Sequence, residues 1–309
     1  MNKIKKLVLD INDQWGKTAT MHENSLKFDY LPELNDPLLI AGFSGWGNAL
    51  DISWGMADFI IRKLDAKAFG HIIPDQFYSF DEKRPTVEIK DGILQKVEKP
   101  GGDFFITNPN ESSRDIIILR AVEPSLKWLY FSDVVLSVCE KFGVKTIICI
   151  GSIFDNVLHT DNVISALASN TSLLSILDTK KVKHANYNGP GGIHSLISHE
   201  AQKRGFDFIN LWCHCPQYLQ GTTHFGMLCK LGNLISEIGG FDLETDELEI
   251  TWQEVSRQIQ NVIDKNPELS GMIDDLKKES RKESEENQDK QGKIINFDNF
   301  QRAKKGSIE

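Results

Sequence analysis

Residues 37–49 read PLLIAGFSGWGNA, a run of apolar residues that passes directly into a cluster of glycines. A short run of consecutive apolar positions is typical of a strand that is buried on both faces. The next apolar residues recur at helical spacing and indicate a helix from about Trp46 to Leu64: Leu50, Trp54, Ala57, Ile61 and Leu64. A strand that turns directly into a helix is the building unit of an α/β fold, which this stretch therefore predicts.

The three glycines of this stretch resemble a phosphate-binding turn at first sight. However, Gly42, Gly45 and Gly47 do not have the Gly-x-Gly-x-x-Gly spacing of a dinucleotide-binding loop. Bulky Trp46 stands where the backbone would have to approach a phosphate, and no lysine follows as in a Walker loop. We interpret Gly45 and Gly47 as allowing a sharp strand-to-helix corner, with Asn48 near the start of the helix and Trp46 at the sheet end or at an interface.

The same alternation of strands and helices continues along the chain. Strands are expected at 68–73, 115–121, 144–150 and 206–212, and helices at 126–142, 192–204, 225–238 and 252–263. Residues 86–107 instead alternate apolar and polar side chains around Asp91-Gly92, which indicates an antiparallel hairpin region. We expect a three-layer α/β/α sandwich with a mostly parallel central sheet and a small antiparallel extension. It would form one domain over residues 1–265, and residues 266–309 would form a charged helical or disordered tail.

Composition argues against several classes of function. The formal charge of −9, from 35 basic and 44 acidic residues, does not suit a nucleic-acid-binding protein. No apolar run approaches the length of a membrane span and no signal-peptide core is present, so we expect a cytoplasmic protein with no membrane partner. Cys213-His214-Cys215 is interpreted as buried thiols beside one polar histidine rather than as a metal site, because no second ligand pair stands at zinc spacing. We expect neither a metal nor a cofactor.

Polar residues follow the predicted strands, and in a parallel sheet the carboxyl ends of the strands are where functional groups gather. The candidates for a catalytic or binding cleft are Arg84, Glu123, His159, Asn188 and His214. Further residues could contact a ligand there: Ser44, Trp46, Asn48, Gly151, Thr160 and Gly189. Asp155 also follows a strand. An acid, a base and a cation would suit glycosyl or acyl chemistry, but each residue has an ordinary structural interpretation, and no Gly-x-Ser-x-Gly or His-Glu-x-x-His motif is present.

Six motifs in series resemble the PAC2 family, which is named for a proteasome assembly chaperone subunit. They are GFSGWGNA (42–49), Arg84-Pro85, DIIILRAVEP (115–124) followed by Trp128, IGSIFDNVLHT (150–160), YNGPGGI (187–193) and WCHCPQY (212–218). The resemblance covers about residues 35–240. Two departures stand out: the neighbours of His159 and Thr160 differ from the usual pattern, and the chain ends in Ser307-Ile308-Glu309 without the tyrosine that some relatives use to dock on proteasome rings.

The resemblance implies a fold similar to that of purine nucleoside phosphorylases, a homo-oligomer that is often a trimer, and a role in protein assembly. It favours a non-catalytic protein-interaction or assembly-chaperone-like protein over an enzyme. Trp46, Trp54 and Trp128 would then be interface anchors, because aromatic side chains dominate such contacts. The alternative is a small-ligand-binding protein, or an enzyme of the hydrolase or phosphorylase type, that uses the strand-end cleft.

Overall fold

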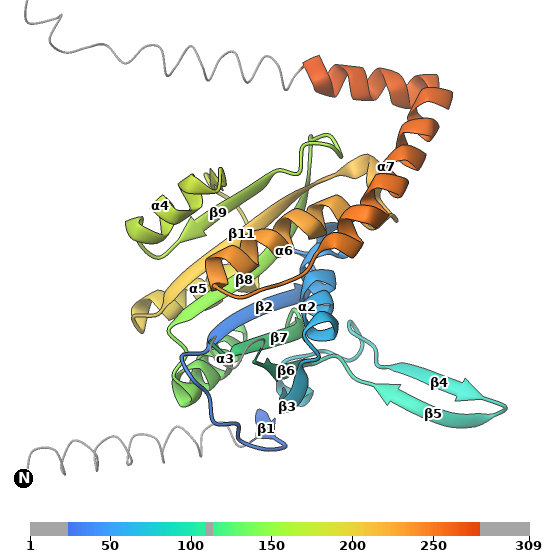
Figure 1. Ribbon diagram of the computed structural model, residues 1–309. Coiled ribbons are helices and arrows are strands. Elements are labelled where there is room, and N and C mark those ends of the chain that lie inside the picture. Colours follow the sequence, from blue (N-terminus) through green and yellow to red (C-terminus); the bar gives the residue numbers. More distant parts are fainter. Residues whose placement is uncertain (1–23, 109–113, 279–309) are drawn as a thin grey trace, which may run out of the picture.

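The computed structural model describes residues 24–108 and 114–278 (Figure 1). Its centre is a nine-stranded sheet in the order β1-β3-β6-β7-β2-β8-β11-β9-β10. The strands are β1 (Leu26–Phe28), β2 (Leu38–Ser44), β3 (Lys67–Ile72), β6 (Gly102–Thr107), β7 (Ile116–Val122), β8 (Thr146–Asp155), β9 (Ile164–Ala168), β10 (Lys183–His184) and β11 (Asp207–Pro216). The four middle strands, β7, β2, β8 and β11, are mutually parallel. Antiparallel pairs flank them on both sides.

Helices cover both faces of this sheet, which confirms the predicted three-layer α/β/α architecture (Figure 1). One face packs against α3 (Trp128–Phe142) and α5 (Ile193–Lys203). The other packs against α2 (Ile52–Lys63), α4 (Thr171–Thr179) and α6 (Phe225–Gly239), and α7 (Asp246–Lys265) lies on α6. Strand β2 is buried along nearly its whole length because it lies in the middle of the sheet and has helices on both sides.

The antiparallel region is also confirmed. Strands β4 (Thr86–Lys90) and β5 (Ile93–Glu98) form a separate two-stranded sheet that projects from the body of the molecule (Figure 1). Asp91 and Gly92 both have positive φ at its tip, as a tight Asp-Gly turn requires. The chain then returns to the main sheet as β6, which pairs antiparallel with β3 and β7.

Three local expectations need correction or extension. The helix expected from about Trp46 begins only at Ile52, after a 3₁₀ turn (Ala49–Asp51) in which Leu50 and Asp51 have positive φ. Strands β9 and β10 and helix α4 lie in a region where no element was expected. Residues 267–278 form a further helix after α7, whereas 279–309 lie outside the described residues. None of the described helices has the length and apolar character that crossing a membrane requires.

Candidate functional site

Gly42, Gly45 and Gly47, at the corner between β2 and α2, are in close contact with other parts of the protein. A Cβ atom on Gly42 would lie 2.4 Å from the Ser53 carbonyl oxygen, and one on Gly47 would lie 2.9 Å from the His194 ring. Gly45 has a φ of +130°, which side-chain-bearing residues rarely adopt, and it packs against Glu123. Packing against protein atoms therefore accounts for the small residues at this corner.

Asn48 caps the helix that follows this corner. Its Oδ1 accepts hydrogen bonds from the backbone N–H groups of Ser53 (2.9 Å) and Trp54 (3.2 Å), which lie in the first turn of α2. Its Nδ2 donates to Asp51 at 2.7 Å. Such capping supplies partners to N–H groups that have none within the helix. The side chain of this candidate ligand residue is thus engaged in local structure.

Glu123 joins the corner to the start of α5. Its Oε2 accepts from the Trp46 N–H and its Oε1 accepts from the Ile193 N–H, both at 3.0 Å. The backbone N–H of Glu123 in turn donates to the Ser44 carbonyl at 2.8 Å. The side chain is buried, and a carboxylate at a helix N-terminus interacts favourably with the helix dipole. Both oxygens hold backbone segments together.

His194, in the first turn of α5, was not singled out from the sequence. Its ring packs against Phe43 and Trp212, and its Nε2 lies 2.8 Å from the Ile150 carbonyl oxygen. Burial lowers the pKa of His194 to about 4, so the ring is neutral near pH 7 and Nε2 carries the donated proton. Nδ1 has no hydrogen-bond partner among the described residues.

His159 belongs to a second buried cluster, beneath α7. The hydroxyl of Tyr218 lies 2.8 Å from His159 Nδ1 and accepts from the His159 backbone N–H at 2.7 Å. The ring of His224 stacks on Trp252 of α7 with a centroid distance of 4.4 Å, and His159 meets the same indole edge-on. Burial lowers the pKa of His159, and it lowers that of His224 to about 4. His159, His224 and Trp252 are all buried, so the two imidazoles have little access to solvent.

His214, by contrast, connects three strands near the surface. Its Nδ1 lies 2.7 Å from Asp155 Oδ2, and its Nε2 lies 2.8 Å from Ser165 Oγ. Asp155 ends β8, His214 is on β11 and Ser165 is on β9. Ser165 was missed in the sequence because no strand was expected there. Asp155 and His214 were recognised because each follows a predicted strand.

The remaining candidates are spread over the surface. Arg84 lies at the base of the hairpin, Thr160 lies in the loop after β8, and Asn188 and Gly189 lie in the loop before α5; all four are exposed. Gly151 is buried beneath the Trp212 ring. Among the predicted interface tryptophans, Trp46 is 56% exposed, Trp54 is covered by the Arg120 guanidinium, and Trp128 packs against the α3 side of the core.

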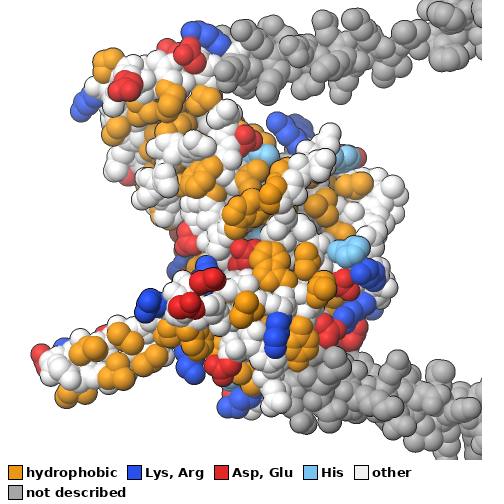
Figure 2. Space-filling view, turned by 180° about the vertical axis from the view of Figure 1, so that it is seen from behind, with side chains coloured by type: hydrophobic (Ala, Val, Ile, Leu, Met, Phe, Trp, Pro, Cys, Tyr) orange, Lys and Arg blue, Asp and Glu red, His pale blue; other side chains and the backbone are white. Residues whose placement is uncertain are grey.

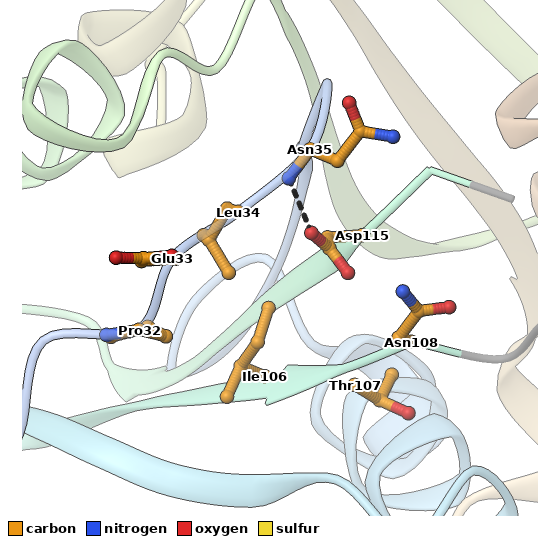
Figure 3. Close-up of a pocket in the computed structure, with 8 residues that line it drawn as sticks. All are labelled: Pro32, Glu33, Leu34, Asn35, Ile106, Thr107, Asn108 and Asp115. Atoms are coloured by element: carbon orange, nitrogen blue, oxygen red, sulfur yellow. Dashed lines mark hydrogen bonds between the residues drawn. The ribbon is translucent and has the colours of Figure 1, made fainter. Parts of the chain in front are cut away.

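None of these candidates lines either of two pockets in the described structure. One, of about 520 Å³, lies at the amino end of β2 and β7, between the segment 32–35 and β6, where the Asn35 N–H donates to Asp115 (Figure 3). The other, of about 340 Å³, lies between α6, Lys180 and Asn162. The first pocket lies at the amino ends of the parallel strands, away from the edge where a cleft was expected, whereas the second is lined by residues that flank β9, β10 and α6.

The Cys213-His214-Cys215 stretch places its thiols and its imidazole on opposite faces of β11. Both thiols are buried, and burial raises the pKa of Cys215 to about 12 and raises that of Cys213 as well. Within 24–108 and 114–278, no three His, Cys, Asp or Glu side chains are grouped as metal ligands would be.

Solved structures with the same fold come from bacteria and archaea. A proteasome-assembly chaperone homologue from Mycobacterium tuberculosis is 22% identical, with a TM-score of 0.70 over 76% of this chain and 99% of that one. A protein of unknown function from Corynebacterium glutamicum is 21% identical, with a TM-score of 0.77 over 85% and 99%. An archaeal proteasome activator from Pyrococcus furiosus is 18% identical, with a TM-score of 0.58 over 77% and 98%. At these identities the likeness shows the fold.

No curated protein matches the chain. The model of the PAC2 family matches residues 39–263, which is most of the sequence. The match includes the strand-to-helix corner that follows β2, Glu123, and the strands that carry Asp155, Ser165 and His214. The chain therefore belongs to the PAC2 family.

Proposed function

We propose that this protein acts by binding protein chains, as a homo-oligomer of the assembly-chaperone type, and that the β4–β5 hairpin is its main contact surface. The observation that carries this proposal is the apolar side of the hairpin. In the strand register Val87 faces Val97 and Ile89 faces Leu94, so these four side chains share one side. Their exposed fractions are 58%, 49%, 62% and 57%. We call these four residues the hairpin apolar face.

The opposite side of the hairpin is polar apart from Ile93, which faces Lys90 next to the turn. Thr86 faces Glu98 and Glu88 faces Lys96 across the strands, and Lys96 pairs with Glu98. Such a two-sided pattern is typical of a sheet that buries one face. In Figure 2 the projecting arm carries a row of hydrophobic side chains that the body of the molecule does not cover.

An isolated two-stranded hairpin is marginally stable in water, because it has no core of its own. Contiguous exposed apolar side chains on a soluble protein commonly mark a protein interface. A second copy of the chain would cover the hairpin apolar face and stabilise the hairpin at the same time. We propose a closed ring of three copies, as the family resemblance implies, in which each hairpin lies on the next copy.

The candidate residues support binding rather than turnover as the main role. The side chains of Asn48 and Glu123 are engaged with backbone groups, and His159 is sealed under α7. The names of two structural relatives, a proteasome-assembly chaperone homologue and a proteasome activator, are consistent with a protein partner. We propose such a partner here as well, in the cytoplasm.

We also propose that the domain ends near residue 265. Helix α7 stops at Asn266, whose side chain accepts from the N–H groups of Glu268 and Leu269 at the start of the next helix. This next helix leaves α7 at an angle (Figure 1). Beyond it the sequence is dominated by charged residues, which suits a tail rather than a core.

Light scattering on the purified full chain tests this proposal. The double variant Ile89→Asp/Leu94→Asp places charges on the hairpin apolar face and should convert the oligomer to monomers. The matched control Glu88→Gln/Lys96→Gln changes the polar side of the same strands and should leave the oligomer intact. A wild-type protein that is monomeric at every concentration and brings down no partner from its native cell would contradict the proposal.

A further inference from the structure

Asp155, His214 and Ser165 form a hydrogen-bonded chain that is separate from the hairpin. Asp155 Oδ2, the His214 ring and Ser165 Oγ are linked at 2.7 and 2.8 Å. An ionised carboxylate only accepts hydrogen bonds, so His214 Nδ1 must carry the proton that Asp155 accepts. In the neutral form of the ring Nε2 is then an acceptor, to which the Ser165 hydroxyl donates. These are the relations of an orienting acid, a general base and a nucleophile.

We propose that Ser165 is a nucleophile for acyl transfer, activated by His214 and oriented by Asp155, and that this site hydrolyses small carboxylic esters. The proposal does not rest on the hairpin or on the oligomeric state.

The scaffold of the site is rigid because all three residues lie on strands of the main sheet. Asp155 pairs with Pro216 at the end of the β8–β11 ladder, and Ser165 pairs with Trp212 in the β9–β11 ladder. The second carboxylate oxygen of Asp155 accepts from the Asn156 N–H at 2.8 Å, which fixes its orientation. Sites held by strands and by supporting hydrogen bonds keep the geometry that catalysis needs.

The three residues differ in how accessible they are to solvent. The side chain of Asp155 is 45% exposed and that of His214 is 17% exposed, whereas Ser165 is only 9% exposed. The base is thus open to solvent water, whereas the nucleophile is nearly buried. The proposed substrates are therefore esters of small carboxylic acids, whose acyl group needs the least space beside Ser165.

A positive charge is available beside the nucleophile. Lys183 is the partner of Ser165 in the β9–β10 register, so the two residues lie on adjacent strands and on the same side of the sheet. Lys183 is exposed and makes no ion pair with the described residues. A cation near the reacting carbonyl stabilises the negative charge that develops on its oxygen.

The reaction balances with water as the second reactant. Ser165 Oγ forms a bond to the carbonyl carbon while its proton passes to His214 Nε2. The bond between that carbon and the alkoxy oxygen breaks, and His214 returns the proton to the departing alcohol. Water then attacks the acyl-Ser165 ester, gives a proton to His214, and releases the carboxylic acid as Ser165 regains its proton.

A fluorophosphonate probe tests the nucleophile directly, because its P–F bond breaks when a serine oxygen attacks phosphorus. We expect the wild-type full chain to gain the mass of one probe less HF, which leaves when the bond to phosphorus forms, and peptide mapping to place the adduct on Ser165. His214→Asn should lower the labelling rate, and hydrolysis of p-nitrophenyl acetate, about 100-fold or more, as loss of a general base does. Lys183→Met should lower hydrolysis while leaving the adduct position unchanged.

Two variants at the nucleophile complete the test. Ser165→Ala should abolish labelling. Ser165→Cys, which keeps a single heavy atom on Cβ, should also abolish labelling, in a protein whose circular dichroism is unchanged. Ser175→Ala, on the exposed side of α4, is the matched control and should react as the wild type does. No adduct on wild-type Ser165, under conditions that label a known serine hydrolase, would overturn the proposal, as would an undiminished rate in His214→Asn.

Discussion

Gly42 on β2 lies directly against the backbone of Ser53 on α2, so close that a Cβ atom on Gly42 would be 2.4 Å from the Ser53 carbonyl oxygen. The Ser53 side chain continues the contact, since its Oγ accepts from the Phe43 N–H at 2.8 Å and donates to the Ile150 carbonyl at 2.5 Å. Strand β2 and helix α2 are therefore in direct backbone contact at the corner that joins them.

Gly42→Ala should consequently be strongly destabilising, by about 3 kcal/mol, because the clash is with backbone and cannot be relieved by a rotamer change. Gly47→Ala should cost less, about 1–2 kcal/mol, since the His194 ring edge can move slightly. Gly55→Ala is the matched control: it lies inside α2 with nothing within 4 Å, and alanine there should stabilise the protein by about 0.5–1 kcal/mol. Urea unfolding measures all three, and equal effects at Gly42 and Gly55 would contradict this explanation.

Asn48→Ala should reduce the free energy of unfolding by about 1–2 kcal/mol, because it leaves the Ser53 and Trp54 N–H groups without their cap. Asn188→Ala, in an exposed loop, should change it by less than about 0.5 kcal/mol. Thermal or urea unfolding distinguishes the two. If Asn48 served a ligand instead of the helix, its replacement would leave stability near that of the wild type.

Glu123→Ala should cost about 3 kcal/mol, because the N–H groups of Trp46 and Ile193 both lose a charged acceptor. Glu123→Gln keeps one acceptor oxygen, and we expect roughly half of that loss. Glu82→Ala, on the exposed segment before the hairpin, is the control, with an expected change within about 0.5 kcal/mol. An alanine variant as stable as the wild type would show that Glu123 is not a structural clamp.

The fold could be predicted largely from local patterns. The buried run of β2 and the helical spacing after it gave the α/β unit, and Asp91-Gly92 gave the hairpin, because these signals depend on neighbours in sequence. The start of α2 was misplaced because Asn48 caps it across a 3₁₀ turn at unusual backbone angles, which no apolar spacing reveals. Strand β9 was missed because it is only five residues long, ISALA, and its Ser and two Ala residues give no clear apolar run.

The candidate site was only partly predictable, because it depends on contacts between segments that are distant in sequence. The rule that polar residues gather at strand ends identified Asp155, Glu123 and His214, but it does not say what they contact. Glu123 meets backbone N–H groups, whereas His214 meets Ser165, a residue at the start of a strand that runs in the opposite direction. Contacts between segments distant in sequence decided which residue is structural and which can react.

His224 provides the last prediction, which concerns pH. Its Nδ1 accepts from the Met227 N–H at 3.2 Å at the start of α6, its ring stacks on Trp252, and its Nε2 has no partner of hydrogen-bond geometry among the described residues. The groups that act on it are His159, which lowers its pKa further, and backbone groups at His159 and His224, which raise it. Burial is the largest effect and favours the neutral ring in the folded state.

Because the folded-state pKa of His224 is about 4 and the unfolded value is near 6.5, the unfolded chain binds the proton more readily. Stability should therefore fall as the pH drops below about 6.5, and between pH 7 and 5 this group alone should remove about 2 kcal/mol. His224→Asn keeps a capping acceptor and removes the titration, so its free energy of unfolding should fall less over the same interval, by about that amount. Parallel urea titrations at pH 7, 6 and 5 measure the two slopes, and identical slopes would show that His224 is protonated as easily in the folded protein as in the unfolded chain.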